Sequence, residues 1–292
     1  MTPRDTFALI AGLGASEIIG RTAQHLRRLG PVPTPFGLSA PVYRARLGEA
    51  HFLLLPRYGD PGEEVAAPWV NYRANMYALR EYGVSRVLAW EDAVAVNFSL
   101  AMGQYVLPND FLDDTRGRES SFYKGTALGG MRHHPLFCEE TKAAAESVLR
   151  MHQTPYQSHG TYLCRQGPHR ESPAEVRWLR SLGGDLAGMA LAPEVYLARE
   201  LEMCYVPLCC IVDYAEGVKQ RGPEAEAMMD DFLSGAQEDA VELARGQLLT
   251  LAAALSRSVL DERTCPCAKG LERYREAGLL KGEDWRQWIG KP

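Results

Sequence analysis

Short apolar runs alternate with segments of helical periodicity along most of the chain. The runs are rich in Val, Ile and Leu and are bounded by Gly and Pro, which is typical of buried strands. This alternation predicts an α/β protein with a mixed, largely parallel central sheet flanked by helices. The predicted strands are Phe7–Ala11, His51–Pro56, Arg86–Trp90, Gln104–Leu107, Gly160–Gln166, Leu186–Met189 and Tyr205–Val212.

Helices are predicted between these strands, and one of them has a clear start signal. Ser172 is followed by proline and then, three residues on, by Glu175, which together predict a capping box with proline in the first turn. We expect one domain over residues 1–292, with a C-terminal tail over residues 268–292 packing on it. Further helices are predicted after Val70, over Cys138–Met151, over Pro193 to Met203 and along the apolar stripe from Ala244 to Leu255. The segment from Pro108 to His134 is predicted to be a loop.

Composition narrows the range of functions. The chain has 292 residues, 46% of them hydrophobic, and a net charge of −5 from 32 basic and 37 acidic residues. Basic residues are scattered, so we expect no nucleic-acid or membrane partner. No secretory signal is recognisable, and the seven cysteines fit buried free thiols of a cytoplasmic protein. Cys265-Pro266-Cys267 is too tight for a zinc hook without further ligands, so a redox disulfide stays open there and no metal is expected.

Residues able to bind ligands follow the predicted strands, where the sites of open α/β sheets lie. Five such segments, taken in order, resemble the trimeric purine nucleoside and 5′-methylthioadenosine phosphorylases. The resemblance implies a phosphorylase/hydrolase-like fold, a purine nucleoside substrate, inorganic phosphate as co-substrate, no cofactor, and a homotrimer or dimer of trimers. The segments are Val70–Asn75, Val106–Asp113, Gly167–Glu175, Gly188–Val195 and Val212–Gly217.

The resemblance assigns residues to the base and to the sugar. Asp213 stands where the family binds the N7 edge of the purine, and an acid there can protonate the leaving base. Glu171 stands where 6-oxopurine enzymes keep a base-binding glutamate, and Arg170 replaces a stacking Phe. Met189 matches the methionine that packs on ribose, and Met229 lies near an apolar 5′ side. The sequence mixes the adenine-type pattern with the 6-oxopurine-type pattern, so the identity of the purine base stays open.

The phosphate end departs from the family pattern. Gly12, Gly14 and Arg57 persist, but Leu13 replaces a phosphate-binding hydroxyl, and Glu91 and Asp92 stand where the family has Thr-Ala or Asn-Ala. Two unit charges about 4 Å apart at an effective dielectric near 20 interact by roughly 4 kcal/mol. Carboxylates beneath the sugar should therefore disfavour a phosphate dianion.

Several functions are compatible with this pattern. The first is a purine nucleoside phosphorylase with an unusual phosphate site. The second is a phosphate-independent nucleoside hydrolase in which Glu91 or Asp92 activates water. The third is a non-catalytic nucleoside-binding homologue, since a fold does not fix the chemistry. A transferase to another acceptor is the fourth.

Overall fold

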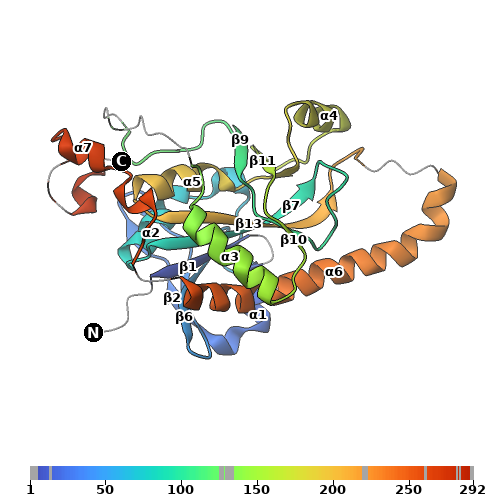
Figure 1. The fold of residues 1–292 in the computed structure, drawn as a ribbon, viewed down its shortest axis with the longest axis horizontal. Coiled ribbons are helices and arrows are strands. Elements are labelled where there is room, and N and C mark those ends of the chain that lie inside the picture. The colour runs from blue at the N-terminus through green and yellow to red at the C-terminus, as the bar shows by residue number, and fades with distance from the viewer. Residues whose placement is uncertain are drawn as a thin grey trace.

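The central feature of the fold is a large mixed sheet (Figure 1). The computed structural model describes residues 6–12, 15–124, 128, 135–218, 223–259, 262–280, 282 and 284–289, without the side chains of 15–17, 23 and 223–237. Within these residues, eleven strands form the sheet, along the order β10-β8-β13-β7-β1-β6-β5-β2 with β9, β11 and β12 branching from it. Its strands are β1 (Phe7–Ala11), β2 (Leu26–Gly30), β5 (Val42–Leu47), β6 (Ala50–Pro56), β7 (Arg86–Ala95), β8 (Tyr105–Val106), β9 (Asp110–Asp114), β10 (Tyr156–Gln157), β11 (Thr161–Arg165), β12 (Leu186–Gly188) and β13 (Cys204–Tyr214), while β3 (Pro33–Thr34) and β4 (Gly37–Leu38) pair separately.

Helices cover both faces of this sheet. Alternate residues of β1 separate the two cores: Ile10 packs with α2 and α5, whereas Leu9 packs with α3 and α6. The predicted capping box is confirmed at the start of α4, where Ser172 and Glu175 exchange hydrogen bonds. The helices are α1 (Ala15–Arg21), α2 (Tyr72–Glu81), α3 (Glu139–Met151), α4 (Pro173–Ser181), α5 (Leu191–Glu200), α6 (Pro223–Ser258) and α7 (Glu272–Glu276), with 3-10 turns η1 (Ala23–His25), η2 (Ala67–Trp69), η4 (Pro266–Lys269) and η5 (Trp285–Gln287).

The predicted fold class is confirmed. The strand β1 pairs in parallel with both β6 and β7, and β7 pairs in parallel with β13, so the centre of the sheet is parallel. Antiparallel pairs join β2 to β5, β5 to β6, β8 to β13 and β12 to β7. Because β1 and β6 are parallel and end at the same level, the residues that follow them are brought together beside the middle of β7.

Three parts of the sheet were not predicted correctly. The strand β7 continues past Trp90 to Ala95, because its second half pairs with β12 and β13. The segment expected to be a loop after Pro108 contains β9, a largely exposed acidic strand. Residues 26–47, for which no strand was predicted, contain β2 and β5, whose alternating arginines obscure the apolar pattern.

The C-terminal segment contacts the body of the molecule at several points. Trp285 packs edge to face against Tyr77 of α2 with ring centroids 4.8 Å apart, and Arg286 is paired with Glu81 of the same helix. Trp288 lies in a small apolar cluster with Tyr123. Among the described helices, none is both long and apolar enough to cross a lipid bilayer.

Candidate active site

The ends of β1 and β6 lie beside the middle of β7 in the sheet. Gly12 follows β1, Arg57 follows β6, and Glu91 lies in β7. The backbone N–H of Arg57 donates to the carbonyl of Ala11 at 2.9 Å, which extends the β1–β6 pairing by one residue. The phosphate-end residues predicted from the sequence are therefore brought together, except that Gly14 lies outside the described residues.

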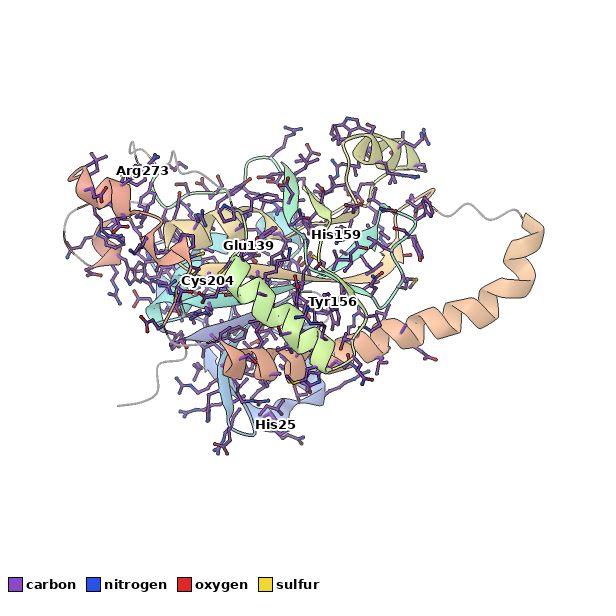
Figure 2. The ribbon with its side chains drawn as sticks, viewed as in Figure 1. His25, Glu139, Tyr156, His159, Cys204 and Arg273 are labelled. Atoms are coloured by element: carbon purple, nitrogen blue, oxygen red, sulfur yellow. The ribbon has the colours of Figure 1, made fainter. Side chains whose placement is uncertain are left out.

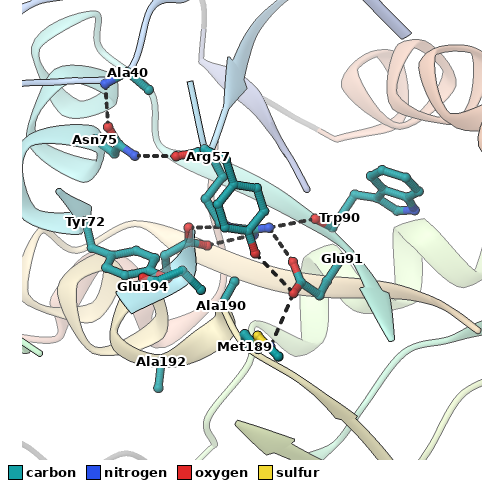
Figure 3. A network of polar contacts seen from close by, with 12 residues as sticks. Ala40, Arg57, Tyr72, Asn75, Trp90, Glu91, Met189, Ala190, Ala192 and Glu194 are labelled. Atoms are coloured by element: carbon teal, nitrogen blue, oxygen red, sulfur yellow. Dashed lines mark hydrogen bonds and ion pairs between the residues drawn. The ribbon is translucent and has the colours of Figure 1, made fainter. Parts of the chain in front are cut away.

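Arg57 is the centre of a buried ionic cluster (Figure 3). Its guanidinium is fully buried and donates to Glu194 at 2.6 and 3.0 Å, to Glu91 at 2.5 Å and to the carbonyl of Trp90 at 3.0 Å. Burial disfavours the charge of Arg57, but the two carboxylates outweigh it and raise the pKa of Arg57 well above its ordinary value. The cation is thus shared between two anions inside the protein.

Glu91 is a carboxylate of this cluster whose acidity is strongly changed by its surroundings. Burial raises the pKa of Glu91 to about 7, although the neighbouring Arg57 opposes the shift. Its second oxygen lies 3.5 Å from the Tyr58 hydroxyl and accepts from the Met189 N–H at 3.4 Å. Near neutral pH this group can therefore exist in either protonation state.

Gly12 is packed closely against the ionic cluster. A side chain at this position would place its Cβ 3.2 Å from a Glu91 oxygen and from the Trp90 carbonyl, and 3.4 Å from an Arg57 nitrogen. Contacts of this kind are tighter than ordinary van der Waals packing, so a larger residue would require its neighbours to shift. Glycine at position 12 therefore lets the end of β1 pack directly against the Arg57–Glu91 pair.

Asp92 does not join Glu91, contrary to the expectation that both carboxylates lie beneath the sugar. Successive residues of a strand point to opposite faces. Asp92 faces α6, where its carboxylate accepts from Arg245 at 2.6 Å, and its side chain is only 7% exposed. Of these two neighbouring carboxylates, only Glu91 therefore faces the Arg57 side of the sheet.

The base-end residues are brought together in two ion pairs. Arg170 donates to Asp213 at 3.0 Å, and both side chains are exposed, at 71% and 45%. Glu171 accepts from Arg165 at 3.2 Å and is nearly buried. Asp213 is thus accessible at the end of β13, while Glu171 is held by its own structural partner.

Met189 contacts both the ionic cluster, through its N–H, and the loop after β11, through its sulfur. Its sulfur lies 2.4 Å from where a Cβ would stand at Gly167, whose φ of +65° also favours glycine. Met229 lies in α6 among the residues whose side chains are not described. The role suggested for it at the 5′ side of the sugar stays a prediction.

Two residues that matter here were not singled out from the sequence. Glu194 is fully buried and also accepts from the Tyr205 hydroxyl at 2.7 Å; the Pro-Glu pair in the Gly188–Val195 segment was its only sequence signal. Arg118 donates to the carbonyls of Met189 at 2.6 Å, Ala192 at 2.7 Å and Gln166 at 2.8 Å. Arg118 therefore fixes the loops after β11 and β12.

The family model and two relatives that match this chain are all described as phosphorylases. A family model described as "Phosphorylase superfamily" matches residues 6–248. The chain is 32% identical to a probable S-methyl-5′-thioinosine phosphorylase of Methanothermobacter thermautotrophicus, over 90% of this chain and 88% of that protein. It is also 32% identical to the 6-oxopurine nucleoside phosphorylase of Pyrococcus furiosus, over 90% of this chain and 97% of that protein.

Solved structures share the fold. A methylthioadenosine phosphorylase from an Antarctic soil metagenomic library superposes with a TM-score of 0.75 at 24% identity, over 92% of this chain and 91% of the other. The methylthioadenosine phosphorylase of Schistosoma mansoni in complex with adenine gives a TM-score of 0.74 at 25% identity, over 93% and 96%.

The buried acid Glu91 predicts a specific pH dependence of stability. The folded protein retains the Glu91 proton up to about pH 7, whereas the unfolded chain releases it near the ordinary value of 4.5. The free energy of unfolding contributed by this group therefore falls as the pH rises through that interval and is constant above it. We therefore compare the free energies of unfolding of the Glu91→Gln variant and the parent. As the pH rises from 5 to 8, their difference should shift in favour of the variant by at least about 1 kcal/mol.

Urea unfolding of both proteins at several pH values measures this difference. The exposed Glu49→Gln variant is the matched control, because it removes a carboxylate outside the cluster. A difference between Glu91→Gln and the parent that stays constant from pH 5 to pH 8 contradicts the prediction.

Proposed function

The chain belongs to the phosphorylase superfamily, and from that membership we propose that it cleaves the N-glycosidic bond of a purine nucleoside. The observation that carries the proposal is the meeting of Gly12, Arg57 and Glu91 in the sheet, where the Met189 N–H also donates to Glu91. The reaction needs the nucleoside and an acceptor, and no cofactor. A cytoplasmic location is part of the proposal.

The residues assigned to the base, the sugar and the nucleophile would each carry out one part of the reaction. Departure of the base leaves a ribosyl cation, so the enzyme must neutralise the base, hold the sugar and place the nucleophile. Asp213 is the accessible acid for the base, and Met189 supplies an apolar surface for the sugar. Gly12 and the Arg57–Glu91 pair form the nucleophile end.

The substrate class that we favour is a 6-oxopurine nucleoside, with or without a 5′-methylthio group. Support comes from Glu171, which stands where the oxopurine enzymes keep a base-binding glutamate, and from the names of the two relatives. Arg170, paired with Asp213, presents an exposed guanidinium that can stack on a purine face.

Phosphate is the acceptor that family membership favours, and the charge of Glu91 should control its binding. With Glu91 ionised, the cluster of Arg57, Glu91 and Glu194 carries a net negative charge. With Glu91 protonated, the cluster is neutral, and the carboxyl group of Glu91 can donate a hydrogen bond to a phosphate oxygen. Phosphate should therefore bind better below the Glu91 pKa of about 7 than above it.

Water is a second candidate acceptor, favoured by one observation. A general base works best with a pKa near the working pH, and burial places that of Glu91 at about 7. An ionised Glu91 beside Gly12 could accept a proton from water as the water attacks the sugar. The product would then be free sugar, and phosphate would not be required.

The acceptor is tested by product analysis of the parent and of Glu91→Gln. Inosine, methylthioinosine, guanosine, adenosine and methylthioadenosine are incubated with and without phosphate. We expect sugar 1-phosphate, and a KM for phosphate that rises from pH 6 to pH 8. In Glu91→Gln that rise should flatten, and the KM at pH 8 should fall by about tenfold, or 1.4 kcal/mol.

The opposite pattern supports water as acceptor. Free sugar formed without phosphate, with a loss of about 10²-fold or more in Glu91→Gln, would assign Glu91 as the base. Saturable nucleoside binding without any product would instead identify a non-catalytic homologue and refute the proposed function.

Asp213 is tested as the acid by a leaving-group comparison. Removing a general acid typically costs 10² to 10⁴-fold in rate, so Asp213→Asn should lose about that much kcat with inosine. With 7-methylinosine, whose base already carries the positive charge, the loss should be small because no proton is needed. Equal losses of kcat on both nucleosides contradict the assignment. The Arg170→Ala variant separates base binding from protonation, because a loss of base binding appears in KM.

We also propose that the protein is a trimer. Trp69, Leu38 and Val65 are 68%, 61% and 44% exposed, and they line a surface cavity of about 320 Å³ together with Arg57 and Tyr58. Such exposed apolar residues are typical of subunit interfaces. A second copy on this surface would close the cavity beside the ionic cluster.

Light scattering after size-exclusion chromatography tests the assembly. The parent should elute with three times the chain mass, and Trp69→Glu should shift it toward the monomer. Trp178→Glu, which changes a 48% exposed residue on α4, is the control and should leave the mass unchanged. A monomeric parent refutes the trimer.

A further inference from the structure

Four cysteines from distant parts of the chain meet on the side of the molecule where β13 begins. Cys138 caps the N-terminus of α3, Cys204 is the first residue of β13, and Cys265 and Cys267 flank Pro266 at the start of η4. Figure 2 labels Cys204 beside Glu139, the first residue of α3. The four sulfur atoms all lie within 4.8 Å of one another.

The spacing of these sulfur atoms fits a common ligand. Zinc binds thiolates at about 2.3 Å in a tetrahedron, which places the sulfurs about 3.8 Å apart. The Cys204 and Cys265 sulfurs are 3.4 Å apart, longer than the roughly 2.05 Å of a disulfide bond. Four mutually adjacent sulfurs match a tetrathiolate more closely than they match two separate pairs.

We propose that Cys138, Cys204, Cys265 and Cys267 bind one structural Zn²⁺ ion. A tetrahedral set of four thiolates selects zinc or iron, and three of the four side chains are buried, as expected of a closed structural site. The proposal concerns stability and is independent of the proposed function. It departs from the expectation of no metal, which rested on the tightness of the C-x-C spacing alone.

The surroundings of the cluster stabilise negative charge on sulfur. Thr141 donates its backbone N–H to Cys138 at 3.5 Å and its hydroxyl at 3.4 Å. The thirteen-residue helix α3 also directs the positive end of its dipole at Cys138. On the opposite side, the Arg263 guanidinium lies 4.0 Å from the Cys204 sulfur. These groups would offset the net charge of −2 that four thiolates and Zn²⁺ carry together.

The ion would fasten the C-terminal segment to the body of the protein. Cys265 and Cys267 belong to the chain that follows α6, whereas Cys138 and Cys204 begin α3 and β13. The Cys138 N–H donates to the Tyr205 carbonyl at 3.1 Å, and the Tyr205 hydroxyl donates to Glu194 of the ionic cluster. Zinc would therefore fix the start of a strand whose second residue contacts the candidate active site.

Metal analysis of the parent protein, purified with reductant and without chelator, provides the first test. We expect one zinc per chain by elemental mass spectrometry, with four thiols that become reactive only after a chelator removes the metal. Replacement by Co²⁺ should give the absorption spectrum of a tetrahedral tetrathiolate, a readout that does not depend on activity.

Variants assign the ligands. Cys267→Ala should lose the zinc, while Cys210→Ala, which removes a buried cysteine of β13 outside the cluster, should keep it. The parent measurements decide the matter even if Cys267→Ala does not fold. Metal-free parent protein with four reactive thiols overturns the proposal, as do two disulfides among these cysteines found by non-reducing peptide mapping, or a metal other than zinc.

Discussion

The structure depends on a buried cation that is shared by two anions. Arg57 lies at the end of β6 with no exposed side-chain surface, and it binds Glu91 of β7 and Glu194 of α5. Removing one partner of a buried ion pair typically costs about 3–5 kcal/mol, because the remaining charge loses its compensation. The cluster therefore joins two strands and a helix, and it fixes the edge of the sheet where the chemistry is placed.

The same constraint shapes the chemistry that this edge can perform. A phosphate-binding site needs a surplus of N–H donors and positive charge. Here the guanidinium is already engaged by carboxylates, so the balance of charge depends on whether Glu91 is protonated. Burial brings that equilibrium close to neutral pH. The ionisation of Glu91 therefore affects both the stability of the fold and the charge at this part of the sheet.

The long strands β7 and β13 connect the features on which function and stability depend. Their parallel pairing places Glu91 beside Cys209, and the register of this pairing shifts between Ile211 and Asp213. The opposite end of β13 begins at Cys204, within the thiol cluster. Pairing along β13 therefore fixes the position of the strand end that carries Asp213.

The local pattern of the sequence by itself determined much of this protein. The apolar runs of the central strands, the capping box at Ser172 and the meeting of Gly12 and Arg57 follow from periodicity and from the rule that parallel strands end at one edge. The tertiary structure decided the rest. Whether Asp92 joins Glu91 depended on how far β7 continues, and that is set by pairing with strands distant in sequence. The cysteine cluster and the partners of Arg57 arise from contacts between segments more than thirty residues apart, which no local pattern records.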